Sequence, residues 1–189
     1  MRKYLLHVLI ISFVFFLTPT IQAAVALGET IEARKQAVKK KSDDAKTHFD
    51  LGVAYLKSGM YKESIEALKQ ATRVDPDYAK AHKTLGYVYL NLYMNKDAIE
   101  SLKQVVRINP DATAHYNLGF VYGRSGMYKE AIEVLKVAIK RDPDHAMSYY
   151  NLGLIYNLSN DKDSALEQYE ILKDLDYDLS DKLFRSIKK

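Results

Sequence analysis

Two twenty-residue segments of this chain are closely similar in sequence. Residues 58–77 read SGMYKESIEALKQATRVDPD and residues 125–144 read SGMYKEAIEVLKVAIKRDPD, with fourteen identical positions at a separation of 67 residues. Because 67 is the sum of 34 and 33, the separation indicates a repeat of about 34 residues with a further copy between these two segments. A Leu-Gly pair recurs with this spacing at Leu51-Gly52, Leu85-Gly86, Leu118-Gly119 and Leu152-Gly153. A repeat of this length predicts four copies of one small structural unit.

Each copy reads as two helices. In the first copy, Ile65, Leu68, Ala71 and Val74 recur every three residues, which is helical spacing. We expect a first helix over about 45–58 and a second over 61–74. Glycine accepts the left-handed conformation at a helix C-terminus, and glycines 59 and 126 stand where first helices end. Prolines end the second helices, and the aspartates after them are expected to cap the next helix: Pro76-Asp77, Pro110-Asp111 and Pro143-Asp144.

Gly52 and its equivalents lie inside the predicted first helices. An interior glycine costs about 1 kcal/mol relative to alanine, so we expect close helix contact to compensate. A small residue follows each glycine by twelve positions and is predicted to supply the facing surface: Ser64, Ala98, Ala131 and Ala165.

These residues resemble the tetratricopeptide repeat family, whose pattern of Leu-Gly, Tyr, Ala and Pro spans about 34 residues. The resemblance implies an all-α, right-handed α-solenoid with repeats at 45–78, 79–111, 112–145 and 146–178. The sequence departs from the family pattern in three respects. The large residue of the pattern is His48, His82, His115 and Tyr149 rather than tryptophan. Tyr93 and Asn160 replace the turn glycine, and we expect Tyr93 to distort its turn. Tyr177 replaces the last proline.

Both ends of the chain depart from the repeat. Residues 179–189 carry a stripe of Leu179, Leu183 and Ile187, which predicts a capping helix over the last apolar face. Residues 1–26 combine a basic start, an apolar run at 4–17 and Ala24-Val25-Ala26, as in a cleaved secretory signal peptide. The expected location is therefore periplasmic or secreted. The alternative is a membrane anchor through residues 4–27. Residues 27–44 read as a charged linker or leading helix.

Composition excludes several classes of function. The chain has no cysteine, which excludes disulfides, cysteine nucleophiles and cysteine metal sites. Cleavage after residue 26 would remove Arg2 and Lys3 from the 28 basic residues, and the remaining 26 against 24 acidic residues, a net charge of +2, are too evenly balanced for a nucleic-acid binder. Equivalent histidines in stacked repeats lie about one helix diameter apart, roughly 10 Å, so we expect His48, His82 and His115 to pack and not to bind metal. No catalytic motif occurs, and we predict no cofactor and no enzymatic activity.

The resemblance also implies a concave groove lined by the first helix of each repeat. Its expected partner-binding residues here are Phe49, Val53, Lys83, Tyr87, Tyr116, Asn117, Phe120, Arg124, Tyr150, Asn151 and Leu154. Aromatic residues exposed together usually mark a contact site, although large side chains also pack between adjacent repeats. Lys83 and Asn117 match two places of the family's carboxylate clamp. Tyr87 and Met147 occupy two others, so the clamp is incomplete and is not predicted.

We therefore expect an exported, non-catalytic scaffold that binds a protein or peptide segment in its groove, in cell-envelope assembly. Asparagine offers both a donor and an acceptor, so Asn117 and Asn151 are expected to pair with a peptide backbone. The alternative is a scaffold of polysaccharide export or glycosyltransfer machinery that contacts carbohydrate through its tyrosines. An enzyme is the weakest of the three hypotheses because repeats and cap occupy residues 45–189.

Overall fold

The computed structural model describes residue 26 and residues 28–188, and its chain divides into two compact units, residues 1–76 and 77–189. Unit 1 holds a helix over 28–40, followed by the antiparallel pair α2 (Ala45–Lys57) and α3 (Tyr61–Val74). These bounds agree with the two helices expected from the repeat pattern. The predicted signal peptide lies almost entirely outside the described residues. Among those that are described, no helix is both long and apolar enough to span a membrane.

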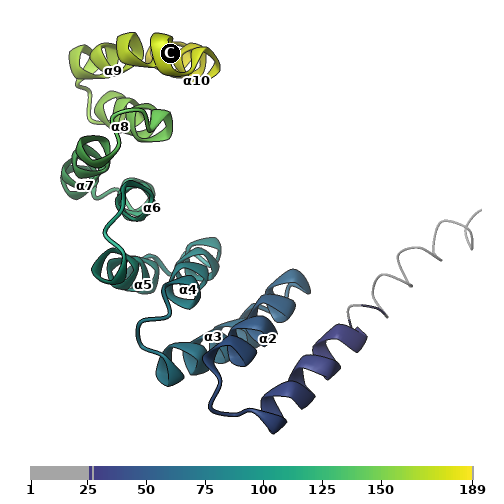
Figure 1. Ribbon diagram of the computed structural model, residues 1–189. Coiled ribbons are helices and arrows are strands. Elements are labelled where there is room, and N and C mark those ends of the chain that lie inside the picture. Colours follow the sequence, from purple (N-terminus) through teal and green to yellow (C-terminus); the bar gives the residue numbers. More distant parts are fainter. Residues whose placement is uncertain (1–25, 27, 189) are drawn as a thin grey trace, which may run out of the picture. The chain divides into compact units, whose positions relative to one another are not determined.

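Unit 2 is a succession of helices, and within it each helix packs against the next one in the chain (Figure 1). They are α4 (Ala79–Asn91), α5 (Asn95–Ile108), α6 (Ala112–Arg124), α7 (Tyr128–Arg141), α8 (Ala146–Leu158), α9 (Lys162–Leu175) and α10 (Tyr177–Ile187). The first helices α6 and α8 also touch each other. The described part of the chain contains helices and no strand, so the predicted all-α class is confirmed.

The turns within the helix pairs share one conformation. Gly59 and Gly126 adopt φ values of 72° and 74°, and Tyr93 and Asn160 adopt 58° and 63° at the equivalent positions. The amide after Tyr93 donates to the Tyr89 carbonyl at 2.9 Å, as the amide after Gly59 donates to Tyr55. The expected distortion at Tyr93 is therefore wrong. The turn keeps its geometry, and tyrosine takes a left-handed conformation that glycine adopts more easily.

The aspartates after the prolines do not all cap helices. Asp111 is the N-cap of α6 and accepts a hydrogen bond from the Ala114 amide at 2.7 Å. In α4 and α8 the N-cap residues are instead Tyr78 and His145, without a side-chain cap. The prediction is thus right for Asp111 and wrong for the aspartates at 77 and 144. The reason is length, because the second repeat lacks the residue that elsewhere separates the aspartate from the helix.

The helical glycines face leucines rather than the predicted small residues. A Cβ built on Gly52 or Gly119 would lie 2.7 Å from the Cγ atom of Leu68 or Leu135, sixteen residues later in each case. The small residue twelve positions later plays a secondary part: the Ser64 hydroxyl donates to the Gly52 carbonyl at 2.8 Å. Close helix contact is confirmed, and a leucine side chain fills the space that a Cβ would take.

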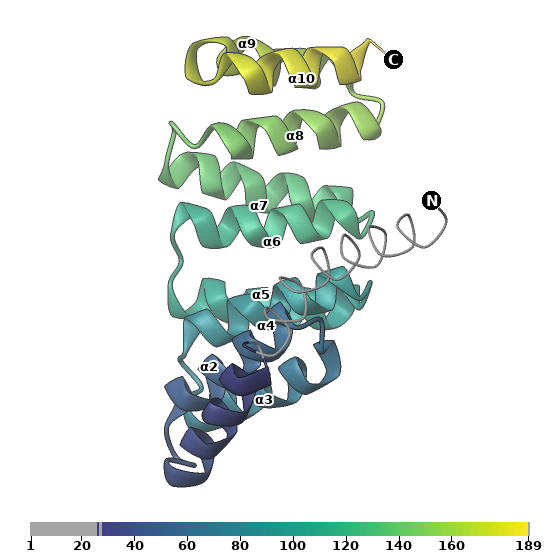
Figure 2. The same ribbon diagram turned by 90° about the vertical axis from the view of Figure 1, so that its right-hand side faces the viewer.

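The C-terminal helix closes the last pair, as predicted. α10 packs against both α8 and α9, and Figure 2 shows it beside α9 at the C-terminal end. Leu183 and Ile187 are buried and Leu179 is half-buried. In the fourth repeat the leucine that faces the glycine comes from this helix, because a Cβ on Gly153 would lie 2.5 Å from Leu183. The equivalent position of α9 holds Tyr169 instead.

Candidate functional site

Nine of the predicted groove residues lie on the first helices of unit 2. We call them the α4–α6–α8 surface: Lys83, Tyr87, Tyr116, Asn117, Phe120, Arg124, Tyr150, Asn151 and Leu154. Phe49 and Val53 lie on α2 of unit 1, where both are half-buried. The interactions described below join α4 to α6 and α6 to α8.

Tyr87 and Asn117 connect α4 to α6. The Tyr87 hydroxyl donates a hydrogen bond of 2.9 Å to Oδ1 of Asn117. Asn117 is only 4% exposed, and its Nδ2 is the one buried side-chain nitrogen or oxygen without a hydrogen-bond partner among the described residues. The Nζ atom of Lys83 lies 5.9 Å from the centre of the Tyr87 ring, within range of a cation–π interaction.

Tyr116 and Asn151 make a second link, between α6 and α8. The Nδ2 atom of Asn151 approaches the Tyr116 hydroxyl at 3.4 Å and donates to the Met147 carbonyl at 3.0 Å. The Tyr116 ring stacks on Phe120 with a centroid distance of 6.3 Å. These contacts fix the two aromatic rings of α6 next to the first turn of α8.

Burial raises the pKa of both linking tyrosines. For Tyr87, loss of solvent raises the pKa of the phenol, and the nearby Tyr116 raises it further. Burial also raises the pKa of Tyr116, against a lowering by its hydrogen bond with Asn151. Both phenols therefore keep their protons at neutral pH. The Tyr87 hydroxyl stays a hydrogen-bond donor, as its contact with the Asn117 oxygen requires.

The structure buries part of the surface that the sequence suggested was open. Asn117 and Asn151 are both buried and already bonded to tyrosines, so neither amide lies bare for a peptide backbone. Tyr150 and Leu154 are half-buried and pack against the C-terminal core cluster around Tyr149. On the α4 portion of the α4–α6–α8 surface, Tyr87 is the exposed apolar side chain, with 36% of its surface exposed. Each aromatic side chain here both packs within the array and faces outward.

A small cavity adjoins Asn117. It has a volume of about 140 Å³ and lies between the start of α4, the end of α5 and the start of α6. Its lining includes Lys80, Lys83 and Asn117, with Asp111 and Thr113 at the start of α6. Two lysines and one aspartate give this cavity a positive balance. Thr113 was missed by the sequence analysis because it stands at an ordinary helix start.

The sequence analysis did not include His145, the N-cap of α8, or Met147 of α8 among the expected binding residues. The His145 ring lies 5.1 Å from the Tyr116 ring, and its Nδ1 atom is 2.8 Å from the Ser148 hydroxyl. Met147 is 40% exposed on the first turn of α8. The sequence analysis considered Met147 only as a missing clamp lysine. A methionine adapts its shape readily to an apolar partner, so it extends the apolar character of this region.

Two histidines of the repeat core make hydrogen bonds to backbone carbonyls. His115 is buried, and its Nδ1 donates to the Asp111 carbonyl at 2.7 Å. The Nε2 atom of His48 lies 2.8 Å from the Ser42 carbonyl. Within the described residues, no group of three or more histidines or acidic side chains is arranged to hold a metal ion.

Comparison with known proteins agrees with the helix-pair architecture. A family model described as TPR repeat matches residues 54–92, and two described as Tetratricopeptide repeat match residues 79–111 and 110–170. No curated protein matches the chain.

Solved structures resemble most of the chain. A crystal structure of MamA is 26% identical, with a TM-score of 0.74 over 83% of this chain and 92% of that one. YrrB, described as a TPR protein with an unusual peptide-binding site, is 25% identical, with a TM-score of 0.73 over 88% of each chain. MamA from Desulfovibrio magneticus RS-1 is 24% identical, with a TM-score of 0.72 over 80% of this chain and 86% of that one, and shows the fold alone.

The repeat pattern, the helix pairs and these matches agree with one another. The predicted fold class, an all-α solenoid of tetratricopeptide repeats with a C-terminal capping helix, is confirmed. The chain belongs to the tetratricopeptide repeat family.

Proposed function

We propose that this protein is a non-catalytic scaffold that binds a segment of a partner protein on the α4–α6–α8 surface. The observation that carries the proposal is the linked set of aromatic and amide side chains across three successive first helices. Tyr87 and Phe120 supply apolar contact there, and Met147 on the first turn of α8 adds to it. Aromatic side chains grouped at a surface commonly dominate binding energy.

The similarity to YrrB supports a peptide as the ligand. That protein's description names a peptide-binding site, and its structure resembles this chain over 88% of the length of each. The positive balance of the cavity at Lys80 and Lys83 favours a segment that carries acidic groups. We expect moderate, micromolar-range affinity because three short helices enclose little of their ligand.

The proposed setting is the bacterial cell envelope. It rests on residues 1–26, which have the order of a secretory signal peptide in the sequence. A scaffold exported in this way would meet envelope proteins as partners. An uncleaved segment at 4–27 would instead hold the same scaffold at a membrane.

In-cell photo-cross-linking tests the binding proposal. Phe120 is replaced by a photoreactive phenylalanine analogue, and cross-linked species are identified by mass spectrometry. The matched control places the analogue at Tyr177, which is 74% exposed on α10 and outside the surface. We expect a defined protein adduct from position 120 and none of the same mass from 177. Equal adducts from both positions would refute the proposal, and exclusive capture of a glycan would favour the carbohydrate alternative.

A further inference from the structure

The helix over 28–40 has the sequence of a second repeat helix. Residues 29–40 read ETIEARKQAVKK, and residues 63–74 of α3, which lie 34 positions later, read ESIEALKQATRV. Seven of these twelve positions are identical, and the separation equals the repeat period. The helix also ends at residue 40, as α3 ends at Val74, and the next helix begins five residues later in both cases. A linker would have no reason to keep this register.

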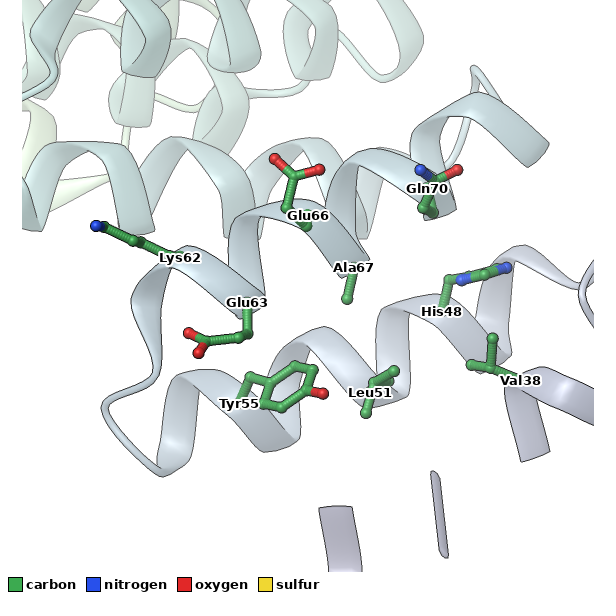
Figure 3. Close-up of a pocket in the computed structure, with 9 residues that line it drawn as sticks. All are labelled: Val38, His48, Leu51, Tyr55, Lys62, Glu63, Glu66, Ala67 and Gln70. Atoms are coloured by element: carbon green, nitrogen blue, oxygen red, sulfur yellow. The ribbon is translucent and has the colours of Figure 1, made fainter. Parts of the chain in front are cut away.

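The contacts of this helix with α2 are those of a second repeat helix with the next first helix. Val38 lines a cavity of about 530 Å³ together with His48 and Leu51 of α2, and Figure 3 shows Val38 beside His48. Where the third repeat meets the fourth, the equivalents of Val38 and His48 are Ile139 of α7 and Tyr149 of α8, and Ile139 packs against the core cluster that contains Tyr149. Arg34 pairs with Asp50 of α2 at 3.5 Å. Residues 28–40 therefore sit on α2 as a repeat helix does.

Among the described residues, no first helix packs against this helix as its own partner. In every complete repeat the equivalents of Thr30 and Ala37 are buried against that partner, and here both are exposed. The buried equivalents are Ser64, Ala98, Ala131 and Ala165 for Thr30, and Ala71, Val105, Ala138 and Leu172 for Ala37. The leucine that faces a helical glycine in three of the repeats is replaced by Arg34. The helix thus presents an unpartnered face of Thr30, Ala33 and Ala37.

We propose that the same face of a second copy of this chain covers it, so that two helices 28–40 pair antiparallel in a homodimer. The helix is acidic in its first half, with Glu29 and Glu32, and basic in its second half, with Lys39 and Lys40. Antiparallel pairing sets Ala33 opposite Ala37 of the second copy. On one flank it sets Glu29 beside Lys40 of the second copy, and by symmetry the same pair forms twice. The small side chains allow the two backbones to approach closely.

Other occupants fit less well. Parallel pairing would set Glu29 against Glu29 and Lys40 against Lys40, which repel. A first helix from residues 11–24 of the same chain would have Leu17-Thr18 in place of Leu-Gly, followed at once by Pro19. Because the face is short and carries no large apolar side chain, the homodimer is expected to be weak and to exchange with monomer.

Cysteine cross-linking tests the pairing and its direction, because the natural chain has no cysteine. Ala33→Cys and Ala37→Cys are prepared separately, in the form of the protein that the cell produces, and are oxidised alone and mixed. The antiparallel pair predicts that the mixture cross-links faster than either variant alone. Lys69→Cys, an exposed α3 position equivalent to Lys35, serves as the control for random collision. Faster cross-linking of either variant alone, or rates equal to the control, would overturn the proposal.

Charge exchange gives a second, independent readout. In sedimentation equilibrium, the average molar mass of the protein should rise from that of one chain to that of two chains as the protein concentration increases. Glu29→Lys and Lys40→Glu should each weaken association by about tenfold, since each removes two symmetric ion pairs. The double variant should restore the dimer to within about twofold. Both substituted positions are exposed, so the helical circular dichroism of all three variants should stay unchanged. A strictly monomeric protein, or a double variant that stays dissociated, would contradict the homodimer.

Discussion

Gly119 and Leu135 are in such close contact that a single added carbon would not fit between their helices. A Cβ on Gly119 would lie 2.7 Å from the Cγ atom of Leu135 and 3.4 Å from the Ala131 carbonyl oxygen. Both neighbours are fully buried. The helix therefore keeps a glycine, in spite of its unfavourable propensity, because α6 and α7 approach each other at this point.

Gly119→Leu should accordingly lower the free energy of unfolding by about 1–3 kcal/mol through overpacking. Chemical denaturation followed by circular dichroism measures the change. Gly28→Ala is the matched control, because nothing lies within 4 Å of a Cβ built there. That control should be neutral or slightly stabilising. A more stable Gly119→Leu protein would show that close helix approach does not explain the glycine.

Tyr93→Gly should stabilise the protein by about 1 kcal/mol. Tyr93 is held at φ 58° and is 80% exposed, so the substitution relieves a left-handed tyrosine and removes little packing. Thermal unfolding of the variant and the natural protein provides the comparison. The converse change, Gly126→Tyr at φ 74°, should lower the melting temperature. The same sign of effect at both positions would contradict this account.

Tyr87→Phe should destabilise more than Tyr116→Phe. Removing the Tyr87 hydroxyl leaves the buried Asn117 oxygen without its donor, at a cost of about 1–3 kcal/mol. Removing the Tyr116 hydroxyl costs less, because Asn151 keeps its bond to the Met147 carbonyl. Urea denaturation of both variants measures the difference. Equal losses in the free energy of unfolding would mean that the Tyr87–Asn117 hydrogen bond stabilises the fold no more than the contact between Tyr116 and Asn151 does.

Export predicts a processed N-terminus. If residues 1–26 form a signal peptide, the natural protein begins near residue 27 and is recovered in the soluble periplasmic fraction. N-terminal sequencing of protein from its natural source measures this directly. An intact Met1 in a carbonate-resistant membrane fraction would favour the anchor at residues 4–27 instead.

The repeat pattern predicted the bounds of the helix pairs nearly to the residue, because these bounds depend on local sequence. Leucine spacing marks the helices, glycine ends the first helix of a pair and proline ends the second. It failed at the helix N-caps, where the length of the connection decides which residue caps. The second repeat is one residue shorter, so Asp111 is the N-cap of α6, whereas the other two aspartates each lie one residue before the N-cap. It also failed where a side chain's partner lies on another helix. Which side chain faces a glycine, and that Asn117 and Asn151 are buried, depend on tertiary contacts that spacing does not encode.

The same limit explains residues 28–40. Their likeness to α3 is present in the sequence, but the four Leu-Gly pairs identify only complete repeats, and no such pair precedes this helix. Thr30 and Ala37 are exposed whereas their equivalents are buried, so this face has no partner among the described residues.

The measurement that tests the central claim most directly is partner recovery by the Tyr87→Ala, Phe120→Ala double variant. Affinity purification from the natural source, with quantitative mass spectrometry, compares it with the natural protein. The control variant is Tyr93→Ala, which removes a more exposed tyrosine outside the α4–α6–α8 surface. Circular dichroism confirms that all three proteins are folded. Each of the two substitutions should cost about 1–3 kcal/mol of binding. The account predicts that partners recovered with the natural protein and with Tyr93→Ala are lost from the double variant. Recovery of the same partners by all three proteins would contradict it.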